Sequence, residues 1–236
     1  LCDLLLTNQE GPAILCDNLS HREGACSLPT STFFNLPAEK REKLIRAAWE
    51  EFGRTSYPES SINKIIQAAV IPRGSFYQYF ADKGDLFRFL LKDFLEELTL
   101  ALEETLKRHS GDLFAALPEY FDQILADHGK YSATREALRG VFQKNPQLGP
   151  ELLPGPESRS AFLEHIRTAV DRSRLDLQGE RDLDYIIETL TGITGKLLAR
   201  AIIGQDPASV RREYHDILSI LRRGMEKRPG EAARAE

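Results

Sequence analysis

The sequence has no cysteine beyond its first 26 residues. The three cysteines are Cys2, Cys16 and Cys26. Disulfides therefore cannot form a framework for the remaining chain, and no spacing of Cys, His, Asp or Glu is typical of a metal site, so we expect no metal. Because a chain with few cysteines suits a reducing compartment, the sequence favours the cytoplasm.

Long apolar runs are also missing. No stretch of about 18 consecutive apolar residues exists, so we expect no membrane partner. The sequence contains no zinc-binding His-Glu-x-x-His, no Gly-x-Ser-x-Gly elbow and no dinucleotide fingerprint. These absences argue against an enzyme and against a cofactor.

The first 31 residues show no sustained hydrophobic period. No Lys or Arg precedes Arg22, so the basic start of a signal peptide is absent. We expect residues 1–31 to be an irregular, disordered extension that is dispensable for folding and DNA binding. The alternative is a regulatory or thiol-sensing arm.

From Pro37 onward the apolar residues recur with a helical period. Leu44, Ala48 and Phe52 recur every fourth residue and predict a helix over 38–53. Ser60 or Ser61 is expected to cap a second helix, a third short helix follows, and Asp82 caps a long fourth helix. Five further helices are expected over 112–128, 132–144, 157–174, 181–203 and 207–223. Pro118 should make the first of these kink or start late. The sequence thus predicts an all-α fold of about nine helices.

The second and third helices have the pattern of a helix-turn-helix. Their inner face is apolar, and their outer face carries polar and aromatic side chains. The inner residues are Ile62, Ile65, Ile66, Val70, Phe76 and Phe80. Segment 36–83 holds eight Lys or Arg against six acids and is net +2, whereas the whole chain is net −5. A local basic face is therefore compatible with nucleic-acid binding, although the whole protein is acidic.

Two strings in this region closely resemble the DNA-binding signature of tetracycline-repressor-type (TetR family) transcriptional regulators. They are SSINKIIQAA at 60–69 and IPRGSFYQYFADKGDLF at 71–87, and the resemblance covers about residues 38–90. The aromatic and Lys run of Tyr77, Tyr79-Phe80 and Lys83 is its most specific part. This chain has Ala69 or Val70 where the family often has a turn glycine, so we expect a slightly different turn geometry.

The resemblance implies an N-terminal helix-turn-helix domain of three helices over 32–83. A long helix would join it to an effector-binding and dimerisation domain over 84–228, followed by a polar tail over 229–236. The implied function is sequence-specific regulation of transcription in the nucleoid by a homodimer on a pseudo-palindromic DNA operator. The resemblance favours a ligand-responsive repressor, but the residues do not separate repression from activation or identify the small-molecule effector.

The resemblance also implies roles for single residues. Arg73 and Gln78 would read bases in the major groove, where Arg pairs with guanine and Gln with adenine. Tyr77 and Lys83 would clamp phosphates, and Tyr79 would either join them or pack on the first helix. The full expected DNA-binding set is Ser61, Asn63, Arg73, Gly74, Ser75, Tyr77, Gln78, Tyr79 and Lys83.

Two further sites are expected in the C-terminal helices. Small residues at spacings of three and four in 181–203 predict close helix packing, either between two subunits or within one. The expected dimer residues are Gly192, Gly195, Ala199, Tyr214 and Leu218. The resemblance implies an effector pocket, and its candidate lining, each member of which could instead be plain core, is Phe114, Tyr120, Phe121, Phe142, Phe162, His165 and Tyr185. The remaining alternative is an all-helical interaction protein that has lost DNA binding.

Overall fold

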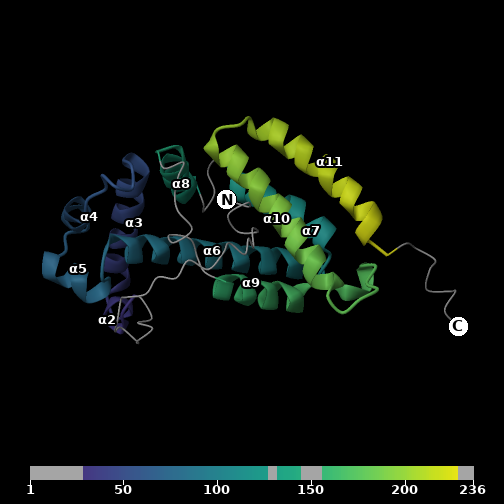
Figure 1. Ribbon diagram of the computed structural model, residues 1–236, viewed down its shortest axis with the longest axis horizontal. Coiled ribbons are helices and arrows are strands. Elements are labelled where there is room, and N and C mark those ends of the chain that lie inside the picture. The colour runs from purple at the N-terminus through teal and green to yellow at the C-terminus, as the bar shows by residue number, and fades with distance from the viewer. Residues whose placement is uncertain (1–28, 127–131, 145–155, 228–236) are drawn as a thin grey trace, which may run out of the picture.

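The computed structural model describes residues 29–126, 132–144 and 156–227 (Figure 1). All nine predicted helices are present in this part of the chain, together with a short additional one, α2 (Ser31–Phe34). The described residues contain no β-strand, only an isolated bridge between Leu175 and Glu226. The predicted all-α fold is confirmed. None of the described helices combines the length and apolar character needed to cross a bilayer.

The helices form an N-terminal head and a larger body, joined by one long helix (Figure 1). The head contains α2, α3 (Ala38–Arg54), α4 (Ile62–Ala69) and α5 (Arg73–Tyr79). The joining helix is α6 (Lys83–Arg108). The body contains α7 (Leu113–Leu125), α8 (Ser132–Lys144), α9 (Pro156–Ala169), the 3-10 turn η2 (Arg172–Arg174), α10 (Asp182–Ile203) and α11 (Pro207–Met225).

Aspartates cap the starts of α6, α7 and α11. The Asp82 carboxylate accepts a hydrogen bond from the Asp85 amide at 2.8 Å, and the Asp85 carboxylate accepts one from the Ala81 amide at 3.1 Å. These bonds satisfy amides that have no partner inside α6. Asp112 and Asp206 cap α7 and α11 in the same way. The predicted start of α6 is therefore confirmed down to its capping residue.

Two boundaries differ from expectation. Pro118 lies inside α7, which nevertheless begins at Leu113, so the predicted late start is wrong. The segment predicted as one helix over 157–174 divides into α9 and the 3-10 turn η2, because Asp171 accepts hydrogen bonds from both the amide and the hydroxyl of Ser173. A side chain that binds nearby backbone in this way favours a turn over a continuing helix.

Aromatic side chains fill the core of the head. Phe76 and Phe80 are fully buried, as predicted. Phe33 of α2 is fully buried too, and its ring lies edge-on to Phe80 with centroids 5.1 Å apart. The domain boundary predicted between residues 31 and 32 falls inside α2, of which only Ser31 was assigned to the irregular extension.

The core of the body is built around Tyr214 of α11. This side chain is fully buried, stacks on Phe121 of α7 at 4.3 Å, and shares a 2.8 Å hydrogen bond with Thr194 of α10. Burial raises the pKa of the Tyr214 phenol well above its usual range. Thr194 of α10 therefore packs against α11 of the same subunit.

Helix α8 bridges the head and the body. Lys144 donates to the carbonyls of Gly53, at 2.9 Å, and Arg54, and so covers the end of α3. Arg139 and Gln143 donate to the carbonyls of Ile202 and Ile203 at the end of α10, at 3.0 and 2.9 Å. The backbones of α3 and α8 touch at their crossing, where a Cβ on Gly140 would lie 2.0 Å from the Gly53 carbonyl oxygen. A shift of α8 toward α3 would therefore displace α3, and a shift away would break the Lys144 bonds.

The turn between α4 and α5 contains a valine in a left-handed conformation. Val70 has φ 55° and ψ 48°, and its side chain is 82% exposed. This conformation allows the Ile71 amide to donate to the Ile66 carbonyl at 3.0 Å and so closes the end of α4. A β-branched residue is strained there, because its Cβ crowds the backbone. The turn therefore differs from the usual glycine turn, as predicted, in that Val70 is held in a strained backbone conformation.

Replacing Val70 with Gly is expected to stabilise the protein. The left-handed conformation costs a non-glycine residue about 1–2 kcal/mol, whereas the added freedom of Gly in the unfolded chain costs roughly 0.4–1 kcal/mol. The net gain of about 1 kcal/mol should raise Tm by about 2–4 °C in a thermal melt. Ala68→Gly, at an exposed position inside α4, is the matched control and should lower Tm. A lower Tm for Val70→Gly would show that the turn is not strained.

Candidate nucleic-acid interface

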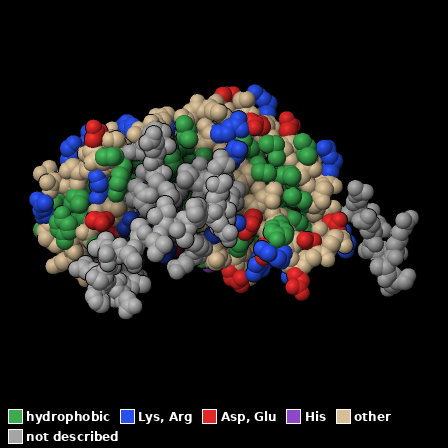
Figure 2. All heavy atoms as spheres, in the orientation of Figure 1, with side chains coloured by type: hydrophobic (Ala, Val, Ile, Leu, Met, Phe, Trp, Pro, Cys, Tyr) green, Lys and Arg blue, Asp and Glu red, His purple; other side chains and the backbone are tan. Residues whose placement is uncertain are grey.

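One exposed face of the head gathers most of the residues predicted to bind DNA. An open depression lies between the start of α4 and the outer side of α5. It is lined by Glu59, Ser60, Ser61, Ile62, Asn63, Arg73, Tyr77 and Lys83. Figure 2 shows Lys and Arg side chains interspersed with hydrophobic ones at the end of the molecule where Figure 1 places α4 and α5.

The outer face of α5 carries polar side chains that have no partner. Positions 73, 74, 77 and 78 are exposed, whereas Phe76 and Tyr79 are buried, so a single helix face points outward. No hydrogen bond or ion pair joins the side chains of Arg73, Tyr77 or Gln78 to any other residue that the structure describes. Asn63 at the start of α4 is exposed and equally unpaired within the described chain. These groups are free to bind an external partner.

Gly74 leaves a bare patch of backbone on this face. A Cβ built at Gly74 would meet no other atom within 4 Å. The fold therefore does not require glycine at this position. A missing side chain in the first turn of α5 instead allows another molecule to approach the helix backbone closely.

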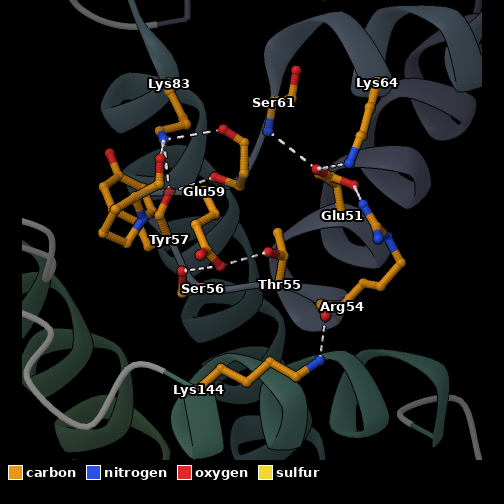
Figure 3. A network of polar contacts seen from close by, with 12 residues as sticks. Glu51, Arg54, Thr55, Ser56, Tyr57, Glu59, Ser61, Lys64, Lys83 and Lys144 are labelled. Atoms are coloured by element: carbon orange, nitrogen blue, oxygen red, sulfur yellow. Dashed lines mark hydrogen bonds and ion pairs between the residues drawn. The ribbon is translucent and has the colours of Figure 1, made fainter.

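The start of α4 is held by a buried glutamate and not by a serine side chain (Figure 3). Glu51 of α3 is 5% exposed, and it accepts hydrogen bonds from the Ser61 amide at 3.1 Å and from Arg54 at 2.5 Å. Ser61 occupies the N-cap position, but its side chain makes no capping bond, and the Ser60 hydroxyl donates to the Tyr57 carbonyl at 2.6 Å. The predicted serine cap is therefore wrong, since a carboxylate from α3 replaces it.

Lys83 anchors the loop between α3 and α4 (Figure 3). Its ammonium donates to the carbonyls of Tyr57, Ser60 and Pro58 at 2.6, 3.1 and 3.2 Å, and lies 4.6 Å from the centre of the Tyr57 ring. Partial burial lowers the pKa of Lys83. An ammonium has only three N–H donors. The expected phosphate contact would therefore require Lys83 to give up one of these bonds.

Tyr79 lies on the core side of α5. It is 6% exposed, and its ring lies edge-on to Phe33 of α2 with centroids 6.1 Å apart. The structure thus supports the packing alternative over the DNA contact, although the partner is α2 and not the first predicted helix. The helical period explains this: Tyr79 follows Phe76 by three residues and shares its inward direction.

The residues predicted to line an effector pocket differ in how far they are buried. Phe114, Tyr120 and Phe121 are buried, Phe142 and Phe162 are partly buried, and His165 and Tyr185 are exposed. His165 points outward because its neighbour Ile166 is fully buried, and its ring nitrogen lies 3.4 Å from Glu103. Arg181 covers the ring of Tyr185 at 5.0 Å. His165 and Tyr185 are thus surface residues, unlike the buried Phe114, Tyr120 and Phe121.

The residues predicted for the dimer interface also differ in burial. Three of the five expected residues, Ala199, Tyr214 and Leu218, are buried within the single subunit. Tyr214 is buried between Thr194 of α10 and Phe121 of α7. Gly192 and Gly195 remain partly exposed. Large exposed apolar side chains on these two helices are Tyr185, Ile203 and Ile220.

Comparison with known proteins agrees with this geometry. The family model "Bacterial regulatory proteins, tetR family" matches residues 44–89, from α3 into the start of α6. Over 189 residues the chain is 31% identical to the uncharacterized HTH-type transcriptional regulator YdgC of Bacillus subtilis. The aligned region covers 76% of this chain and 91% of that relative. The chain belongs to the TetR family of transcriptional regulators. The resemblance inferred from the sequence is confirmed.

Further relatives place this TetR-family chain among DNA-binding regulators and not among enzymes. It is 28% identical over 176 residues to the HTH-type transcriptional repressor Rv1474c of Mycobacterium tuberculosis, covering 72% of this chain and 86% of that one. A transcriptional regulator from Rhodococcus sp. Rha1 has the same fold, with a TM-score of 0.57 and 20% identity over 82% of this chain and 100% of the other. The predicted function as a DNA-binding regulator of transcription is confirmed.

Three features of the head had no clear sequence signal. The left-handed Val70, the Glu51 bond to the Ser61 amide and the α2 contact all depend on tertiary structure. Glu51 could have been suspected from its position, because it lies one residue before Phe52 on a helix whose apolar face it partly shares. At Val70 the sequence indicated only a different turn geometry, and the α2 contact had no local pattern.

Proposed function

We propose that this TetR-family regulator is a homodimeric, ligand-responsive repressor that places α5 in the major groove of a pseudo-palindromic operator. The observation that carries the proposal is the outward face of α5, where unpaired Arg73 and Gln78 lie beside the bare backbone of Gly74. Arg matches guanine and Gln matches adenine in that groove. Ser61 and Tyr77 have hydroxyls suited to phosphates. A repressor is favoured because the relative Rv1474c carries that name.

Gly74→Ala tests whether DNA approaches α5 closely. The added methyl meets nothing in the free protein and raises helix propensity, so stability should rise by up to about 1 kcal/mol. On the operator the same methyl should displace α5 and weaken binding about tenfold or more, a loss of ~1.4 kcal/mol. Thermal melts and fluorescence anisotropy with a duplex selected from a random pool measure the two effects.

Gly224→Ala is the matched control. Gly224 lies near the end of α11, far from α5 in Figure 1, and a Cβ there also meets nothing within 4 Å. This control should gain similar stability and keep full operator affinity. If Gly74→Ala binds the operator as tightly as the wild type, α5 does not approach DNA through its first turn.

The proposed dimer joins two copies of the outer surface of α10 and α11. Partly exposed Gly192 and Gly195 and the exposed apolar side chains of Ile203 and Ile220 support this surface. A two-fold dimer would present two copies of α5 to half-sites one helical turn apart, about 34–36 Å, or a multiple of that spacing. Tyr214, Leu218 and Ala199 contribute only by holding α10 and α11 together.

Gly195→Leu should shift the dimer toward monomer. A bulky side chain inserted at a close helix contact costs about 1–3 kcal/mol, so the dimer Kd should rise about 5- to 150-fold. Operator affinity should fall with it, since each monomer would bind one half-site alone. Analytical ultracentrifugation measures the dimer. A Gly195→Leu protein that stays fully dimeric at nanomolar concentration would exclude this interface.

The last part of the proposal is that a small-molecule ligand controls DNA binding. Helix α8 supports it, because its side chains cover the ends of both α3 and α10. An effector bound in the body that shifted α8 would change how the two heads are spaced. Coupling between two such sites is typically about 1–3 kcal/mol. Apolar and cationic small molecules should be screened for release of the operator, and a true effector should lower its affinity about 5- to 150-fold.

A further inference from the structure

Thr30 lies outside both the matched family region and the predicted helix-turn-helix domain of 32–83, yet it contacts α5. The Thr30 hydroxyl donates to the Gln78 carbonyl at 2.6 Å, and the Thr30 amide donates to the Tyr79 carbonyl at 3.2 Å. Both carbonyls belong to the last turn of α5, where a helix leaves its carbonyls without internal partners. Thr30 therefore caps the end of α5 from a distant part of the chain.

Phe33 fixes Thr30 in place. It is fully buried, and its ring lies edge-on to Phe80 after α5 and to Phe89 of α6, both with centroids 5.1 Å apart. Pro29 on the other side of Thr30 is buried as well. The cap is thus held between two buried side chains and tied to α6, the longest helix of the structure.

Helix α5 depends on such contacts because it is short. It has seven residues, about two turns, and isolated helices of this length are not stable in water. Its outward end carries Gln78, whose side chain is exposed and unpaired. The carbonyl that accepts the Thr30 hydroxyl belongs to this same residue. The direction in which Gln78 points is therefore coupled to Thr30.

We propose that Thr30 is a positioning residue for DNA recognition, which orients the end of α5 so that Gln78 meets its base. The proposal rests on the proposed function and adds to it a specificity determinant outside the helix-turn-helix. Thr30 itself touches neither base nor phosphate in this role. Its loss should reduce discrimination between sequences and leave general affinity for DNA unchanged.

Full-length Thr30→Val and Thr30→Ser proteins test the cap, since valine matches threonine in shape but lacks the hydroxyl. Thr30→Val should raise the operator Kd about three- to tenfold, as expected for a lost hydrogen bond in each subunit, with Tm almost unchanged. Its affinity for a scrambled duplex should equal that of the wild type. Thr30→Ser should restore operator binding. Thr99→Val, which removes a 2.8 Å bond to the Leu95 carbonyl in α6, is the control and should not affect DNA binding.

A double mutant separates positioning from simple stabilisation. If Thr30 acts through Gln78, Thr30→Val should have little effect on operator binding in a Gln78→Ala background, because coupled residues are not additive. Fully additive losses would overturn the proposal. Equal losses on operator and scrambled DNA would also overturn it, because they would show that Thr30 only supports the fold.

Hydrogen exchange of residues 73–80 tests the cap without DNA. Exchange in this segment should be faster in Thr30→Val than in Thr30→Ser and the wild type, and unchanged exchange would refute the positioning role. A wild-type protein that prefers no DNA sequence would refute the proposed function instead. The two failures are therefore distinguishable.

Discussion

Replacing Arg73 with Ala is expected to weaken operator binding by about 1–3 kcal/mol in each half-site, and hence by about 2–6 kcal/mol in the dimer. Arg73 begins α5, is exposed, and has no partner among the described residues. A guanidinium in that position can donate two hydrogen bonds to one guanine. The preference for guanine at one operator position should relax, while stability should not change.

The measurement is anisotropy titration of the operator, its single-base variants and a scrambled duplex over a series of salt concentrations. Arg172→Ala in η2 removes the same charge from the exposed body surface and should leave all affinities close to wild type. Equal losses on operator and scrambled DNA, together with a salt slope reduced by about 2 for the dimer, would make Arg73 a phosphate contact. The base-reading role would then be wrong.

Lys83→Met should destabilise the protein by about 2–4 kcal/mol. Methionine keeps the apolar stem but leaves three carbonyls of the α3–α4 loop without their charged donor, and hydrogen bonds to charged groups are worth about 1.5–3 kcal/mol each before exposure to water reduces them. Tm should fall by about 4–16 °C in a thermal melt. Binding to operator and to random DNA should fall together, because the displaced loop carries Ser61 and the start of α4.

Lys64→Met provides the control for Lys83→Met. Lys64 lies on the exposed side of α4, and its closest acidic partner is Glu51 at 3.9 Å. Its loss should change Tm little, because exposed ion pairs contribute about 0–1 kcal/mol. If Lys83→Met melts like the wild type but lowers the salt slope by about 2, Lys83 is a phosphate clamp and not a loop anchor.

The parts of the fold that the sequence predicted are those determined by neighbouring residues. Asp82 and Asp206 cap their helices through amides two or three positions away, so their roles can be read locally. Phe33 could not be interpreted in this way, because its partners Phe80 and Phe89 lie far along the chain. Helix α2 has only four residues, which is too short for a helical period to be visible in the sequence.

In the candidate site, too, the sequence predicted features set by neighbouring residues and missed those set by distant ones. The outward direction of Arg73 and Gln78 follows from the spacing of buried residues in α5, so the sequence identified it correctly. The partners of Lys83 are carbonyls of a distant loop, which no spacing reveals. In α10, small residues predict a close helix neighbour but not whether it belongs to the same subunit, and for Thr194 that neighbour is Tyr214 of the same subunit.

Selection of bound duplexes from a random DNA pool by the full-length protein tests the central claim most directly. The account predicts one enriched pseudo-palindrome whose half-sites are about 10–10.5 base pairs apart or a multiple of that spacing, with conserved guanine and adenine positions that Arg73→Ala and Gln78→Ala respectively relax. An unenriched pool, or an enriched sequence that neither variant alters, would contradict recognition of DNA through the outward face of α5.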